Sequence, residues 1–120
     1  MPKTVRVTNL SRSVDLATSA GLADGFLSRL RGLLGRTELT MGEGLVIVPC
    51  SLVHMLGMKI PLDVVYLDRQ GTVLRVVPNL KPGQLGPHVW KSHSVVELPV
   101  GAIEASGTEP GDRVIVERVA

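Results

Sequence analysis

The sequence predicts a mainly β fold, a small antiparallel barrel or sandwich of about seven or eight short strands with one short helix. Short apolar stretches recur along the chain, and turn-forming residues separate them. Valine and isoleucine together outnumber leucine, and β-branched side chains favour strands. A parallel α/β fold would need helices alternating with strands, and the pattern does not supply them. We therefore expect one domain that spans residues 1–120.

The first third of the chain predicts a hairpin and then the helix. Residues 5–9 and 13–17 each alternate apolar and polar side chains, as half-buried strands do, and the short stretch between them suits a hairpin loop. The periodicity then changes over residues 24–34, where five apolar side chains fall on one helical stripe. Asp24 is a suitable N-cap and Gly35 a suitable C-terminal glycine for this helix.

The remaining elements are short and separated by glycine and proline. The stretch at 44–48 is apolar on both faces and predicts a central strand that ends at Pro49. The stretches at 61–68 and 72–77 predict a hairpin. After a loop at 81–92, the pattern predicts the following elements: a strand at 95–98, one helical turn at 102–106 and a last strand at 114–119.

Composition argues against several functional classes. The chain has 13 lysine and arginine residues against 11 acidic ones, a net charge of +2, and 2% aromatic residues, which does not favour nucleic-acid binding. No apolar run is long enough to span a bilayer. The first residues lack the apolar stretch of a signal peptide, and the single cysteine, Cys50, fits a reducing compartment. We therefore predict a soluble, cytoplasmic protein.

Cys50, His54, Met55 and Met58 form the densest group of reactive side chains. Thiolate, imidazole and thioether are ligands for soft metals. On a straight strand, however, positions four apart lie about 13 Å from each other, so Cys50 and His54 would chelate one ion only if the segment turned. The alternative is a small buried thiol with core methionines and a hydrogen-bonded histidine. We predict no metal site.

Asp63 stands in a predicted strand whose neighbours on both faces are apolar. A carboxylate buried there needs a partner or has a raised pKa, and such groups are often functional. The alternative is a structural acid that accepts backbone hydrogen bonds or pairs with Lys59 or an arginine.

Arg29, Arg31 and Arg36 form a local basic group around the predicted helix, and Arg29 and Arg36 share one face of it. Guanidinium groups recognise anions, so Arg29 and Arg36 are candidate ligand-binding residues. The alternative is a solvated face or a structural ion pair.

The loop at 81–92 contains Trp90 and is long for a compact domain, which is typical of lids and binding loops. Trp90 is therefore a candidate ligand-binding residue, although a large ring can also plug the end of a barrel. His88 or His93 could join a nearby serine and Glu97 in a hydrolase-like set, but sequence proximity does not define a triad.

The residue pattern also resembles a known family. The run FLSRLRGLLGR and the motif P-C-x-x-x-H-M-x-x-M-x-x-P-L-D-V-V-Y-L-D at residues 49–68 are similar to the small prokaryotic family known as domain of unknown function 192. The resemblance implies a compact, mainly β domain and supplies no reaction. It marks these polar and glycine positions as recurrent: Arg29, Gly32, Arg36, Cys50, His54, Asp63, Glu97 and Gly101.

Two functional hypotheses follow. The first is a binding or accessory module with a pocket for a small polar or anionic ligand, framed by the helix and the long loop. Its candidate residues are Arg29, Arg36, Cys50, His54, Asp63 and Trp90. The second is an enzyme or metal-dependent protein that uses Asp63 with Cys50 or His54. The sequence names neither a cofactor nor an oligomeric state.

Overall fold

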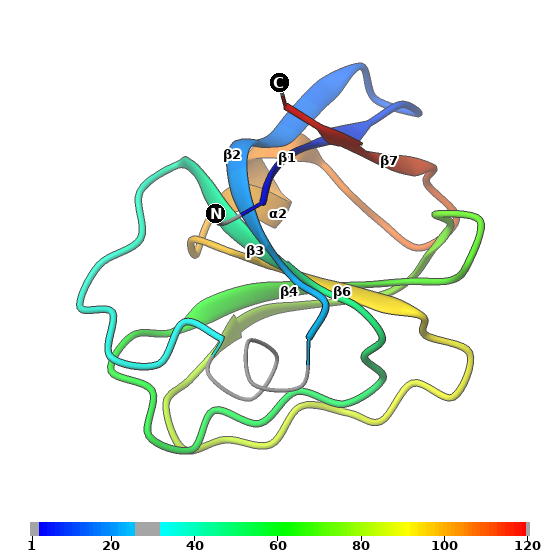
Figure 1. The fold of residues 1–120 in the computed structure, drawn as a ribbon. Helices are drawn as coiled ribbons and strands as arrows, with labels where there is room; N and C mark the ends of the chain where they lie inside the picture. The colour runs from blue at the N-terminus through cyan, green and yellow to red at the C-terminus, as the bar shows by residue number, and fades with distance from the viewer. Residues whose placement is uncertain (1–2, 26–31, 120) are drawn as a thin grey trace.

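The computed structural model describes residues 3–25 and 32–119, which form one curled sheet and one short helix (Figure 1). The elements in chain order are β1 (Thr4–Asn9), β2 (Val14–Ala23), β3 (Gly42–Ile47), β4 (Leu62–Leu67), β5 (Val73–Leu80), β6 (Ser94–Leu98), α2 (Ala102–Ser106) and β7 (Val114–Arg118). The seven strands lie in the order β5-β4-β6-β3-β2-β1-β7. The mainly β prediction is confirmed.

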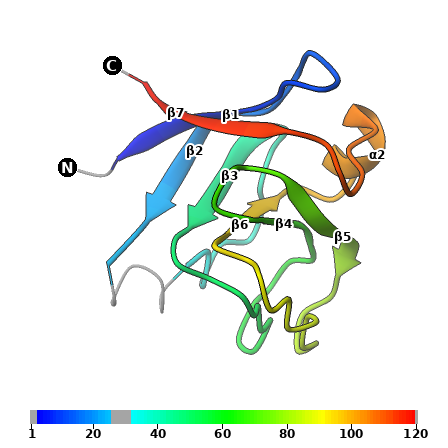
Figure 2. The ribbon, with the colours of Figure 1, turned by 90° about the vertical axis from the view of Figure 1, so that its right-hand side faces the viewer.

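The sheet curls into a half-barrel, which brings its two edge strands together at one corner (Figure 2). Thr72 and Arg113 form an isolated bridge between the starts of β5 and β7. The Val73 N–H donates to the carbonyl of Asp112, and the Val114 N–H donates to that of Gly71, each at 2.8 Å. These bonds satisfy backbone groups that an open edge would leave exposed.

Pairing within the sheet is antiparallel, with β2 and β3 as the exception. Parallel neighbours need a crossover connection, and residues 24–41 supply it. The predicted helix at 24–34 lies in this crossover. Its residues 26–31 are outside the described residues, and the stretch at 32–35 that follows is a turn.

The predicted strands match the observed ones within a few residues, except at two ends. β2 continues to Ala23 instead of residue 17, because a bulge near Ser19 interrupts the alternation that the sequence pattern relies on. β5 continues through Pro78 to Leu80, which is tolerated because β5 is an edge strand. The helical turn at 102–106 is confirmed as α2, which ends at the left-handed Gly107.

Strands β3, β6 and β4 carry apolar side chains on both faces. On the inner face, Val65 and Val96 pack in the half-barrel core with α2 and with β1, β2 and β7. On the outer face, Val64 and Val95 belong to a second core, which irregular segments cover. This two-sided burial explains why these strands read as continuous apolar runs.

Candidate functional site

The outer face is covered by two irregular segments, residues 49–60 and residues 81–93, which lie in the lower part of Figure 1. Backbone hydrogen bonds of 2.7–3.0 Å join the two segments along their length. The donor–acceptor pairs are Cys50 N to His93 O, Met55 N to Gln84 O, Gly83 N to Met55 O, Gly86 N to Val53 O and Val89 N to Ser51 O. The two segments thus form one continuous layer on the sheet.

Tyr66 fixes this layer to β4. Its ring is fully buried in the outer core, and its hydroxyl donates a 2.8 Å hydrogen bond to the carbonyl of Pro87. Burial raises the pKa of the Tyr66 hydroxyl to about 12, so the group stays a proton donor. A side chain at Gly86 would come within 2.9 Å of that hydroxyl, which explains the glycine there.

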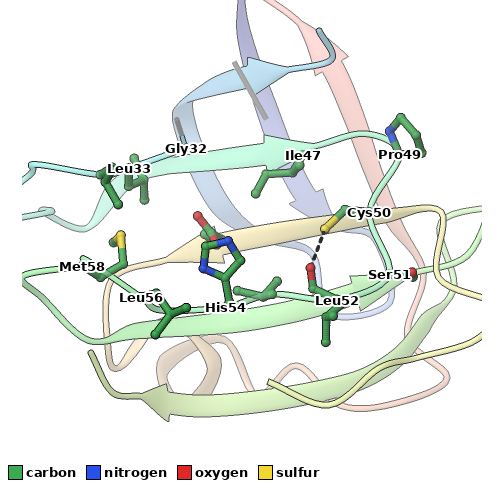
Figure 3. A pocket seen from close by; sticks show the side chains of 13 residues that line it. Gly32, Leu33, Ile47, Pro49, Cys50, Ser51, Leu52, His54, Leu56 and Met58 are labelled. Atoms are coloured by element: carbon green, nitrogen blue, oxygen red, sulfur yellow. Dashed lines mark hydrogen bonds between the residues drawn. The ribbon is translucent and has the colours of Figure 1, made fainter. Parts of the chain in front are cut away.

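A pocket of about 350 Å³ opens between the 49–60 segment, the end of β3 and the described end of the crossover (Figure 3). Most of its lining is apolar, and it has no lysine or arginine among the described residues. The lining residues are Gly32, Leu33, Leu34, Ile47, Pro49, Cys50, Ser51, Leu52, Val53, His54, Leu56, Met58 and Glu97.

Alternation along residues 52–56 determines which side chains reach the pocket mouth. Val53 and Met55 are buried against the sheet, whereas Leu52, His54 and Leu56 are exposed. This is the pattern of an extended chain. In Figure 3 the His54 ring lies between Met58 on one side and Cys50 on the other.

Glu97 supplies the carboxylate of the pocket. It stands on β6 between Leu45 of β3 and Val64 of β4, and its side chain is on the outer face with Val95. Glu97 is 5% exposed and lines the pocket, yet no hydrogen bond or ion pair joins its carboxylate to the described residues. Burial in this apolar setting raises its pKa from 4.5 to about 7.

From the sequence, Glu97 is a member of a possible hydrolase set and a recurrent family position, and it is not among the candidate ligand-binding residues. The available signal was the one that singled out Asp63, namely an acid inside an apolar strand, because residues 95–98 read Val-Val-Glu-Leu. Neither histidine of the imagined set, His88 or His93, lines this pocket in the described structure.

Cys50 and His54 line the same pocket, whereas no residue of the long loop at 81–92 belongs to its described lining. The Cys50 thiol donates to the carbonyl of Leu52 at 3.3 Å (Figure 3). Among the described residues, no three histidine, cysteine, aspartate or glutamate side chains are grouped closely enough to hold a metal ion. The pocket therefore combines a thiol, an imidazole and a carboxylate without forming a chelate.

Asp63 has a different role from that of a pocket residue. It is 1% exposed and accepts hydrogen bonds from the backbone N–H groups of Asn79 (2.9 Å), Gly101 (3.1 Å) and Ile103 (2.9 Å). These bonds tie β4 to the end of β5 and to the start of α2. Asp63 does not line the pocket, so the structure does not bring it together with Cys50 and His54.

The remaining candidates lie outside the pocket lining. Arg36 is exposed and forms an ion pair with Glu43 at 3.2 Å. Arg29 is outside the described residues. Trp90 is 80% exposed, with the Lys91 ammonium 5.8 Å from its ring centre, so it does not plug the barrel. The loop at 81–92 is held by the backbone bonds given above.

The comparisons with known proteins agree with this architecture. The family model for uncharacterized ACR proteins, DUF192, matches residues 7–116. The chain belongs to the DUF192 family. No curated protein matches it. No helix in the described part of this DUF192 chain is long and apolar enough to cross a lipid bilayer.

Two crystal structures share the DUF192 chain's fold. One is a protein of unknown function from Novosphingobium aromaticivorans DSM 12444, with a TM-score of 0.81, 27% identity, and coverage of 95% of this chain and 84% of that one. The other is a "putative transcription regulator" from Sinorhizobium meliloti 1021, with a TM-score of 0.79, 24% identity, and coverage of 97% and 94%. Both structures support the half-barrel fold, and the description of neither protein names a reaction.

Proposed function

We propose that this DUF192 chain is a binding module, and that its site is the pocket on the outer face. One observation carries the proposal: Glu97 is almost completely buried, lines an apolar pocket of about 350 Å³, and has no partner among the described residues. A buried acid without a partner is costly for the fold. A ligand that satisfies the carboxylate would offset that cost, which is typical of a binding site.

The chemistry of the lining favours a mostly apolar ligand with one polar group. The lining carries no lysine or arginine among the described residues, and Arg36 is already paired with Glu43. These observations support a polar group on the ligand more than they support an anionic one. The pocket volume lies at the small end of known ligand sites, which favours a compact molecule.

An enzyme that uses Cys50 and His54 is a second candidate, because both line the same pocket. Catalysis by cysteine requires the thiolate. The Cys50 thiol donates to the Leu52 carbonyl, a contact that only the protonated thiol can make. This contact favours the binding module.

Nucleic-acid binding has less support, despite the name of the Sinorhizobium neighbour. Arg6 pairs with Asp15, and Arg12 pairs with Glu109 and Asp112. Phosphate recognition relies on cations that are available to the ligand. Together with the net charge of +2, these pairs support our prediction of no nucleic-acid partner. A cytoplasmic location likewise stays a prediction, supported by the single cysteine.

A fragment screen by protein NMR tests the proposed function. Compact apolar compounds with different polar groups are added, and we expect backbone shifts to concentrate at Ile47, His54 and Glu97. Leu56→Trp should block binding, because Leu56 lines the pocket and its 64% exposure leaves room for the change without harm to the core. Leu85→Trp is the matched control, since Leu85 is 68% exposed and lies outside the lining.

The screen can also reject the proposal. If no fragment shifts pocket residues, or if Leu56→Trp and Leu85→Trp bind the hits equally well, the outer pocket is not the binding site.

A further inference from the structure

We propose that the ligand of the outer pocket is an apolar amine, bound through an ammonium group that pairs with the carboxylate of Glu97. This inference rests on the proposed function and narrows it to one class of compound. The charges that line the pocket, the position of Glu97 and the apolar walls around it support an ammonium group as its partner.

The described lining has one acid and no lysine or arginine. Its only basic side chain is His54, which is exposed at the mouth instead of being paired with Glu97. A charged carboxylate in such a setting attracts a cation and repels an anion, and the low polarity of the walls strengthens both effects. The lining thus favours an amine over a carboxylate as the ligand's polar group.

The surroundings of Glu97 also limit which groups can donate hydrogen bonds to its carboxylate. The cross-strand neighbours on either side are Leu45 and Val64, which offer no hydrogen-bond donor from their side chains. A partner must therefore come from the open side of the pocket. An ammonium group supplies both a positive charge and N–H donors, and a charge-assisted hydrogen bond is stronger than a neutral one.

The rest of the pocket matches the apolar part of such a ligand. Ile47 and Val53 contribute buried aliphatic surface, while Leu34, Leu52 and Leu56 are exposed leucines in the lining. Burying these side chains against a ligand removes apolar surface from water. A purely polar amine would leave this surface uncovered, so the geometry points to an amine attached to a compact hydrocarbon group.

Binding of an amine should depend on pH in a defined direction. With a pKa of about 7, Glu97 gains its charge as the pH rises from 6 to 8, whereas an alkylammonium stays charged throughout. The affinity should therefore rise about tenfold over this range. The titratable groups near Glu97 are His54 and Cys50, which line the pocket, and Tyr66 on the same face of β4, whose pKa of about 12 keeps it neutral over this range. His54 also lines the pocket, so the same pH series in a His54→Gln variant isolates the contribution of Glu97.

Three probes with one ring and different polar groups test the inference: benzylamine, benzyl alcohol and benzoate. Their affinities are measured by NMR titration at pH 8 with the complete chain. We expect benzylamine to bind about tenfold more tightly than benzyl alcohol, and benzoate to bind more weakly than either. Glu97→Gln should remove the preference for benzylamine, whereas Glu104→Gln, an exposed acid on α2, should keep it.

Several results would overturn the amine inference. They are equal or tighter binding of benzyl alcohol or benzoate, an unchanged preference in Glu97→Gln, and no binding of any probe. The pH series provides a test that needs no Glu97 variant: an affinity for benzylamine that stays flat from pH 6 to 8 in the wild type also overturns it. The fragment screen with Leu56→Trp decides separately whether the pocket binds ligands of another class.

Discussion

Two buried acids stand on neighbouring strands and face opposite sides of the sheet. Asp63 on β4 belongs to the inner face, and Glu97 on β6 belongs to the outer face. Both are at least 95% buried, yet Asp63 accepts three backbone hydrogen bonds and Glu97 accepts none from the described residues. Asp63 thus stabilises the fold through backbone hydrogen bonds, whereas Glu97 is available to bind a ligand.

Burial alone does not identify a functional acid. The decisive property is whether the protein itself supplies the donors. The turn before α2 and the end of β5 bring N–H groups to Asp63, while the cross-strand neighbours of Glu97 are aliphatic. Replacing Asp63 should therefore lower the stability of the fold. Replacing Glu97 should raise its stability at neutral to basic pH and weaken ligand binding.

The largest expected effect comes from Asp63→Ala. Three backbone donors would lose their acceptor, and each abandoned donor costs about 1–3 kcal/mol when it is buried, so we expect a loss of at least about 3 kcal/mol in the free energy of unfolding. Asp63→Asn should cost less, about 2–3 kcal/mol, because its amide nitrogen would replace one of the two accepting oxygens. Urea denaturation measures both values.

Glu104→Ala serves as the control for an exposed acid and should change the free energy of unfolding by less than about 0.5 kcal/mol. Small and equal losses in both Asp63 variants would show that the three hydrogen bonds do not hold β4, β5 and α2 together.

The next effect concerns Glu97 and has the opposite sign. Its pKa is raised from 4.5 to about 7 in the folded state, so between these pH values the folded protein holds a proton that the unfolded chain has released. Stability should therefore fall as the pH rises through this window, by about 3 kcal/mol. Glu97→Gln should be more stable than the wild type at pH 8 by a similar amount, and nearly equal to it at pH 4.

Urea denaturation of both proteins at pH 4 and pH 8 gives the comparison directly. A Glu97→Gln variant that is less stable than the wild type at pH 8 would mean that the charged carboxylate is satisfied within the protein.

These two acids also show which features of the structure could be predicted from the sequence. The alternation of apolar residues located the strands, and the turn before Gly107 located α2, because these signals are local. The sequence also placed an acid at Asp63 inside an apolar strand. It could not tell which acid was satisfied, because the donors to Asp63 lie 16–40 residues away along the chain.

The candidate site was predicted in part for the same reason. Cys50 and His54 lie on one segment and line one pocket, which the sequence alone could not show because the path of the chain between them is irregular. Arg36 and Trp90 were chosen by residue type, and their contacts with Glu43 and Lys91 depend on loop geometry that local patterns do not encode. The position of Glu97 in the pocket could not be predicted from the sequence, because the opposite wall comes from the distant segment at 49–60.

A smaller effect is expected at the layer that covers the outer face. Tyr66→Phe removes the hydroxyl that donates to the Pro87 carbonyl, and should lower the free energy of unfolding by about 1 kcal/mol. Hydrogen exchange should then show faster exchange at Gly86 and Val89, while the inner core stays protected. Uniform loss of protection across the inner strands would contradict a separate outer layer.

The smallest effect is expected at Trp90. Because its ring is 80% exposed, Trp90→Ala should change the free energy of unfolding by less than about 0.5 kcal/mol. Its fluorescence should match that of a tryptophan in water and change little when benzylamine binds, since Trp90 lies outside the pocket lining. A blue-shifted emission would show that the ring is covered in solution.

The pKa of Glu97 in the free protein decides whether this acid is the binding group of the outer pocket. Its side-chain carboxyl carbon can be followed by NMR as a function of pH in the free protein, with the Glu97→Gln variant confirming the assignment. We predict a midpoint near 7, because Glu97 is 95% buried in an apolar pocket and accepts no hydrogen bond from the described residues. Saturation with benzylamine should move this midpoint downward, since the ammonium stabilises the charged form. A midpoint at or below 4.5 in the free protein would contradict the account, because it would mean that Glu97 is already solvated or paired.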